Sequence, residues 1–151
     1  MKNISYAQLL ILITFALTMT ACGGKMAITN VDFAQPFEIV MQSDSNGNVM
    51  DQRTGLSFSV SEILENEQIS NQDFIGTDVH VIQNNQGYYF VTARGFKHVY
   101  VMQVAESSLE SVSMIEVSET GLNNPAFNQR KPYIQLIDGS SSYNLTKNGI
   151  N

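Results

Sequence analysis

The sequence has few of the residues that usually build catalytic and metal centres. It contains one cysteine, no tryptophan and two histidines in 151 residues. A single cysteine excludes an internal disulfide and a zinc site built on several thiolates. Charged residues make up 15%, below the usual quarter, and the formal net charge is −6. The scattered cations form no basic stripe, so we expect no nucleic-acid partner.

Long hydrophobic runs are missing except near the start of the chain. The apolar run Ala7–Leu17 follows the positive start Met1-Lys2, and the small residues Thr18, Thr20 and Ala21 come after it. Its length is typical of a secretory signal peptide, with an apolar region of about 7–15 residues, whereas a membrane-spanning helix needs about 20. The first acidic residue is Asp32, as expected of a segment that enters a bilayer.

The only cysteine, Cys22, directly follows this segment. The stretch Leu17-Thr18-Met19-Thr20-Ala21-Cys22-Gly23-Gly24 resembles the lipobox of bacterial lipoproteins. The resemblance implies that residues 1–21 are a signal peptide removed by signal peptidase II. It also implies that Cys22 carries a diacylglyceryl group and an N-acyl chain. Met19 departs from the family pattern, in which Leu is usual. Each buried methylene contributes about 0.8 kcal/mol, so two or three chains would hold the protein on a membrane.

Two other interpretations of the first 24 residues remain. One is an ordinary secretory signal that leaves Cys22 as a free thiol, and the other is an uncleaved N-terminal helix. Lipidation accounts better for a lone cysteine in an exported protein. Because Gly23 is not Asp, the resemblance further implies the outer membrane, with the protein on its periplasmic face.

The rest of the chain has the pattern of strands and turns. We interpret residues 22–31 as a tether and residues 32–151 as a single β domain of ordinary size. Apolar and polar residues alternate in several short segments, and Gly- and Asn-rich turns separate them. The loops are too short for parallel crossovers. We therefore predict an all-β fold of about eight strands, as an antiparallel sandwich or small barrel.

Local signals refine this prediction. Asn46-Gly47 is the pair favoured by a type I′ hairpin turn. The spacing Ser59-Val60-Ser61-Glu62 matches a capping box and predicts one short helix near 61–68. Towards the C-terminus we expect a loop over 107–111, a strand over 112–117 and a longer loop from Gly121 to Pro132.

The candidate chemistry is sparse. Asp44–Asn48 resembles the start of a calcium loop, but Val49 and Gly55 occupy the positions that need Gly and Glu, so a hairpin turn is the better account. His80 and His98 lie in predicted strands and would need further ligands to complete a zinc site. We assign them structural or surface roles, and we expect no metal and no cofactor apart from the covalent lipid on Cys22.

Signatures of catalysis are also missing. The stretch Gly55–Ser59 falls short of a nucleophile elbow because its last position is Ser. Glu62, Glu65 and Glu67 are interpreted as the solvated face of the short helix. We therefore expect that the protein is not an enzyme.

An aromatic segment gives the only candidate binding surface. Alternation places Tyr88 and Phe90 on one face of a strand and Tyr89 on the other. One face must be core, and the other would present Tyr89, Arg94 and Tyr100 to a partner, since Tyr and Arg are enriched at interfaces. The alternative is ordinary cross-strand pairing on that face.

These observations predict an envelope lipoprotein whose periplasm-facing domain binds a protein partner. Its role would be accessory, assembly or inhibitory, for example immunity against a basic toxin that the acidic surface would attract. The alternatives are a small periplasmic hydrolase with a non-standard site, or a structural subunit of an envelope complex.

Overall fold

The computed structural model describes residues 37–105 and 108–151. Cys22 and the predicted signal peptide and tether (residues 1–31) lie outside these residues. The strands are β1 (Ile39–Gln42), β2 (Asn48–Asp51), β3 (Leu56–Ser59), β4 (Asp78–Gln83), β5 (Tyr89–Ala93), β6 (His98–Ala105), β7 (Ser108–Glu116), β8 (Pro125–Arg130), β9 (Tyr133–Asp138), β10 (Ser141–Thr146) and β11 (Gly149–Ile150). The described helices are α2 (Ser61–Glu67) and α3 (Asn71–Phe74).

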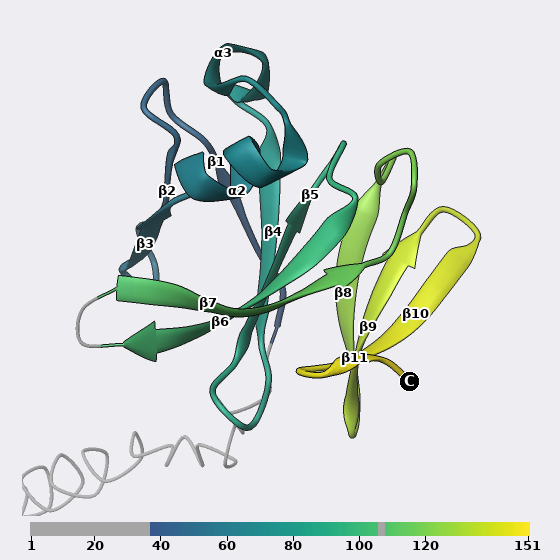
Figure 1. Ribbon diagram of the computed structural model, residues 1–151. Coiled ribbons are helices and arrows are strands. Elements are labelled where there is room, and N and C mark those ends of the chain that lie inside the picture. Colours follow the sequence, from purple (N-terminus) through teal and green to yellow (C-terminus); the bar gives the residue numbers. More distant parts are fainter. Residues whose placement is uncertain (1–36, 106–107) are drawn as a thin grey trace, which may run out of the picture. The chain divides into compact units, whose positions relative to one another are not determined.

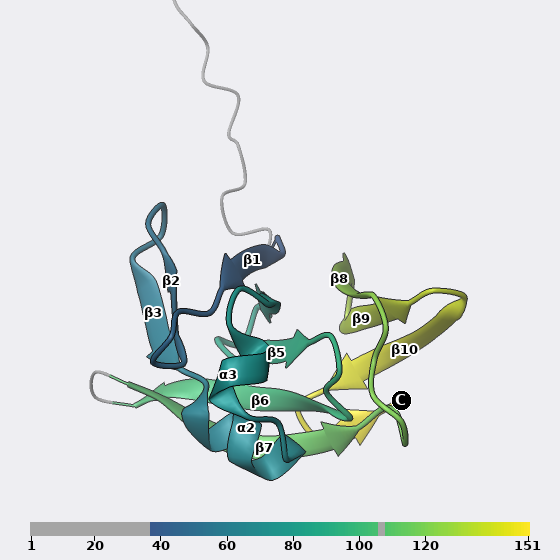
Figure 2. The same ribbon diagram turned by 90° about the horizontal axis from the view of Figure 1, so that it is seen from above.

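The strands form an antiparallel sandwich. A five-stranded sheet has the order β1-β4-β5-β6-β7, and a four-stranded sheet has the order β11-β10-β9-β8. The hairpin β2–β3 and the two helices cover one face of the five-stranded sheet, and the four-stranded sheet packs on the other (Figures 1 and 2). The predicted all-β antiparallel fold is thus confirmed, as a sandwich.

Both faces of the five-stranded sheet are buried at its centre, on β5 and the first half of β6. On β5, Val91 belongs to the core under the helices, whereas Phe90 belongs to the core between the sheets. On β6, Tyr100 and Val101 divide in the same way. Successive side chains of a strand point to opposite faces. A strand with both faces covered therefore has a nearly continuous apolar sequence, as in Val99–Met102.

The short helix predicted near 61–68 is confirmed as α2, but the capping box expected at its start does not form. The N-cap is Val60, which makes no side-chain capping hydrogen bond. The Ser59 hydroxyl instead accepts from the backbone N–H of Ser61 and donates to the Ser61 hydroxyl. A side-chain cap is found instead at helix α3, which the sequence did not predict. There the Ser70 hydroxyl accepts from the backbone N–H of Asp73.

The turn after β1 differs from the predicted type I′ turn. That turn requires positive φ at both central residues, but here only Gly47 has it, at +75°. The Asp44 carboxylate accepts backbone N–H groups from Asn46 and Asn48, each at 2.8 Å. These bonds lower the pKa of Asp44. The carboxylate that suggested a calcium loop is thus engaged by its own turn.

Two predicted loops are strands. β7 begins at Ser108, so the expected loop over 107–111 is wrong. The pairing of β7 with β6 shifts register between Val101 and Met102. β8 occupies half of the expected loop from Gly121 to Pro132. Its sequence was uninformative because it lacks β-branched residues and begins with Pro125, a residue tolerated at the start of an edge strand.

Candidate functional site

The aromatic surface predicted from the sequence does not form as a unit. Tyr100 is only 2% exposed and lies in the core under the helices. Tyr89 packs against the same core and is half-buried, whereas Arg94 is exposed in the turn after β5. The prediction of an exposed Tyr100 is wrong because the helices and the β2–β3 hairpin cover the face that alternation had left open.

A buried carboxylate explains the position of Tyr100. The Glu67 side chain is 0% exposed. It accepts hydrogen bonds from the backbone N–H groups of Lys97 and His98, at 2.7 and 3.2 Å. His98 Nδ1 at 2.9 Å and the Tyr100 hydroxyl at 3.0 Å contact the same carboxylate. Glu67 is therefore a link between α2 and β6, and its assignment to a solvated helix face is wrong.

Burial and the adjacent Glu67 carboxylate raise the pKa of Tyr100 above its ordinary value of 10.0. Desolvation and a neighbouring negative charge both disfavour the phenolate. The hydroxyl therefore stays protonated and donates to Glu67 over the whole physiological range.

His80 contacts a different glutamate, Glu38, on the face of the five-stranded sheet opposite to His98. His80 Nδ1 lies 2.8 Å from Glu38 Oε1, which also accepts the backbone N–H of Phe127 at 2.6 Å. His80 alternates with Val79 and Val81 of the helix-side core, so it points away from that core and from His98. The two imidazoles do not converge, and no cluster of three or more His, Cys, Asp or Glu residues suited to a metal occurs in the described ranges.

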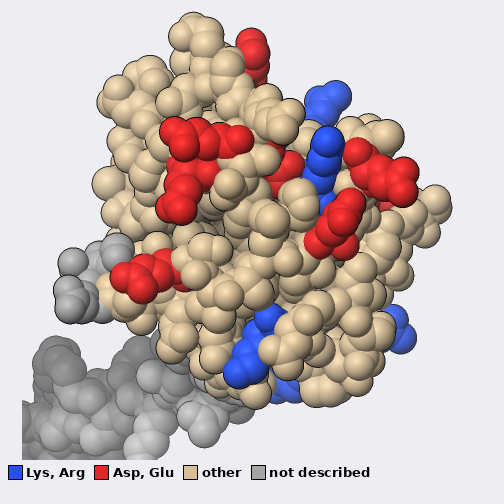
Figure 3. All heavy atoms as spheres, viewed as in Figure 1, with Lys and Arg blue, Asp and Glu red and all other residues tan. Residues whose placement is uncertain are grey.

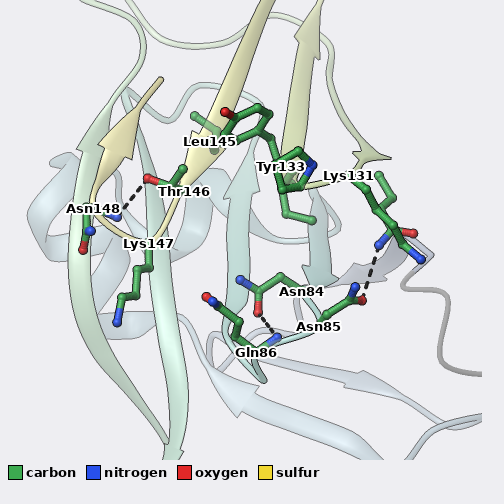
Figure 4. A pocket seen from close by; sticks show the side chains of 12 residues that line it. Asn84, Asn85, Gln86, Lys131, Tyr133, Leu145, Thr146, Lys147 and Asn148 are labelled. Carbon is green, nitrogen blue, oxygen red and sulfur yellow. Dashed lines mark hydrogen bonds between the residues drawn. The ribbon is translucent and has the colours of Figure 1, made fainter.

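A groove of about 510 Å³ opens where three turns meet at one end of the sandwich. We call it the turn-end groove (Figure 4). The β4–β5 turn forms one side, and the turns β8–β9 and β10–β11 form the rest. Its lining residues are Asn84, Asn85, Gln86, Gln129, Lys131, Pro132, Tyr133, Ile134, Leu145, Thr146, Lys147 and Asn148.

The turns that line the groove are held by local hydrogen bonds. The side-chain oxygen of Asn84 accepts the backbone N–H groups of Gln86 and Tyr88, at 2.9 and 3.0 Å. The backbone oxygen of Lys147 accepts from the Ser113 hydroxyl at 2.7 Å, which ties the β10–β11 turn to β7. The Thr146 hydroxyl accepts from the backbone N–H of Asn148 within that turn.

Lys147 is positioned by an aromatic neighbour. Its Nζ donates to the Tyr88 hydroxyl at 3.3 Å and lies 5.1 Å from the centroid of that ring. An ammonium at this distance from an aromatic ring is attracted by the ring's quadrupole. Lys131 supplies a second cation from the β8–β9 turn, and Arg130 precedes it in the chain.

The charge of the groove lining is opposite in sign to the net charge of the chain. Acidic residues outnumber Lys and Arg by 14 to 8 in the sequence, yet no Asp or Glu lines the groove. In Figure 3 most acidic side chains lie in the upper half of the view, whereas basic side chains appear both among them and in the lower part. A concave site lined by charge of one sign concentrates ligands of the opposite sign.

No known protein family, curated protein or solved structure matches the chain. No helix within residues 37–105 and 108–151 has the length and apolar character needed to cross a membrane.

A second hollow, of about 460 Å³, lies over the β2–β3 hairpin and includes Asp44, whose carboxylate is already engaged by its turn.

Sequence reasoning missed the turn-end groove. Most of its residues are polar, and many lie in turns, which have no periodic pattern and are ordinarily solvated. The available signal was the concentration of cations near the C-terminal end, Arg130-Lys131 and Lys147, together with the amide run Asn84-Asn85-Gln86. The pairing of β8, β9 and β10, together with the packing of their sheet against β4 and β5, brings these segments together.

Proposed function

We propose that this protein is a lipid-anchored lipoprotein of the bacterial envelope and that its β domain acts by binding. The turn-end groove carries the binding part of the proposal, because it gathers cations and amides from three separate turns in a concave site. The lipobox around Cys22 supports the anchor. The proposed location is the periplasmic face of the outer membrane, and the proposed role is accessory, assembly or inhibitory.

The anchor is tested by labelling cells with an alkyne-modified fatty acid. We expect the wild-type protein to be labelled and to lose residues 1–21. Cys22→Ser should abolish both the label and the cleavage, because the thiol that accepts the lipid is missing. Met19→Leu, which restores the usual lipobox residue, is the matched control and should be labelled at least as well as wild type. Unchanged processing and membrane fractionation of Cys22→Ser would refute the anchor.

The binding role is tested separately, by recovery of partners from intact envelopes with the wild-type and Cys22→Ser proteins. We expect the anchored form to recover a partner specifically. Recovery of no partner, together with hydrolytic activity of the pure full-length protein, would replace binding by catalysis as the function.

A further inference from the structure

We infer that the turn-end groove binds an acidic carbohydrate, a hydroxyl-rich chain that carries spaced carboxylate groups. This inference rests on the proposed binding role, and it specifies the ligand of the same groove. It follows from the cations, the amides, the aromatic ring and the size of the site.

The cations account for the carboxylate. Lys131 and Lys147 reach the groove from different turns. Lys147 Nζ uses one of its three hydrogens towards the Tyr88 hydroxyl, and the contact holds the ammonium at the edge of the groove. Its other N–H groups remain for a ligand. Charged hydrogen bonds of ammonium to carboxylate are about twice as strong as neutral ones.

The amides account for the hydroxyl groups. Asn84, Asn85, Gln86, Gln129 and Asn148 all line the groove. A side-chain amide both donates and accepts, and so does a sugar hydroxyl. The oxygen of Asn84 already accepts two backbone N–H groups, so that amide offers its NH₂ as a donor. Gln129 donates to the side-chain oxygen of Asn85 at 3.4 Å, which leaves the Asn85 NH₂ in the same role.

The remaining lining suits a sugar ring. Tyr133 borders the groove beside Leu145 and Thr146 (Figure 4). Its side chain has an apolar body and a polar tip, which matches the C–H face and the hydroxyl rim of a pyranose. The volume of about 510 Å³ lies within the range of ligand pockets, about 300–1,000 Å³. It far exceeds the space needed by a single inorganic anion.

The charge of the chain favours sparse over dense anions. With a net charge of −6, the protein repels a strand that carries one phosphate per about 3.4 Å. A carbohydrate with isolated carboxylates meets the two groove lysines without bringing many further charges towards the acidic surface.

The test is a calorimetric titration of the full-length protein, purified in detergent. The probe is hexagalacturonate, and its carboxyl-reduced form is the matched neutral sugar. We expect saturable binding of hexagalacturonate and at least tenfold weaker binding of the reduced form. Lys131→Gln and Lys147→Gln should each weaken binding about tenfold, the change expected when about 1.4 kcal/mol of a charged hydrogen bond is lost. Lys147→Arg should restore most of it.

Lys97→Gln is the control variant, because its side chain is exposed and does not line the groove, and it removes the same charge. Equal weakening by Lys97→Gln would show general charge attraction and overturn the inference. So would equal affinity for a hexathymidylate or for inorganic phosphate, or undiminished binding of the reduced sugar. These titrations do not depend on acylation. A failed titration beside normal labelling and partner recovery would therefore reject the ligand class and leave the proposed function standing.

Discussion

At Glu67, one buried carboxylate accepts hydrogen bonds from two backbone N–H groups and from the Tyr100 hydroxyl, and it also contacts His98 Nδ1. Unsatisfied buried donors each cost about 1–3 kcal/mol. The carboxylate thus explains why the last turn of α2 lies against the start of β6. These contacts also compensate the burial of a charged side chain beside the apolar residues Ile63 and Leu64 of the same helix.

We expect Glu67→Ala to lower the free energy of unfolding by about 3–5 kcal/mol, the range for breaking a buried charged network. Glu67→Gln should lose less, since its amide oxygen can still accept. Glu65→Ala on the same helix is the control: the side chain is exposed, and such changes stay within about 0.5 kcal/mol. Urea unfolding followed by circular dichroism measures all three. Equal losses at Glu65 and Glu67 would contradict the buried link.

Among the elements, two loops meet through backbone contact. Gly95 donates its N–H to the Leu122 carbonyl, and Leu122 donates its N–H to the Phe96 carbonyl, both at 2.8 Å. Gly121 has φ +97°, and a Cβ there would lie 2.6 Å from the Gly95 oxygen. Glycine is needed here both for the conformation and for the close approach.

Gly121→Ala should therefore destabilise the protein by about 2–4 kcal/mol, from backbone strain together with the steric clash. Gly139→Ala makes a matched control, because Gly139 also has positive φ but a Cβ there meets nothing within 4 Å. We expect about 1 kcal/mol for that strain alone. Chemical denaturation of both variants checks the difference, and a smaller loss at Gly121 than at Gly139 would contradict the close contact.

Some of the strands and helices can be predicted from the sequence, and others cannot. Alternation and β-branched residues located β4, β5 and β6, because packing in these strands depends on apolar side chains. The short helix was found from its apolar face, although the expected cap was absent. β8 is not predictable from the sequence, because Ala126–Arg130 has little strand preference of its own and forms a strand by pairing with β9. Glu67 and the groove depend on contacts between distant segments, which local pattern does not contain.

For the whole molecule, stability should decline at both ends of the pH scale for different reasons. Hydrogen bonds from the Asn48 and Asn46 backbone lower the pKa of Asp44, and those from Thr54 and Arg53 lower that of Asp51. Their contribution is fully present above the unfolded value of 3.8 and is lost as the pH falls through the lower folded values. The raised pKa of Tyr100 acts oppositely: its contribution is present below 10.0 and is lost as the pH rises through the folded value.

Thermal unfolding measured across pH checks both losses of stability, the one at acid pH (the acid limb) and the one at alkaline pH (the alkaline limb). Asp44→Asn with Asp51→Asn should flatten the acid limb and leave the alkaline limb unchanged. Tyr100→Phe should flatten the alkaline limb only, because it removes the titrating hydroxyl. An alkaline limb that persists unchanged in Tyr100→Phe would assign that transition to another group.

Glu38 directly precedes β1, and its carboxylate contacts His80 of β4 and the backbone of Phe127 in β8. β1 and β8 are edge strands of different sheets. A pull on the chain ahead of β1 would therefore act on both sheets at Glu38, and it would have to break these contacts before it could peel β1 from β4.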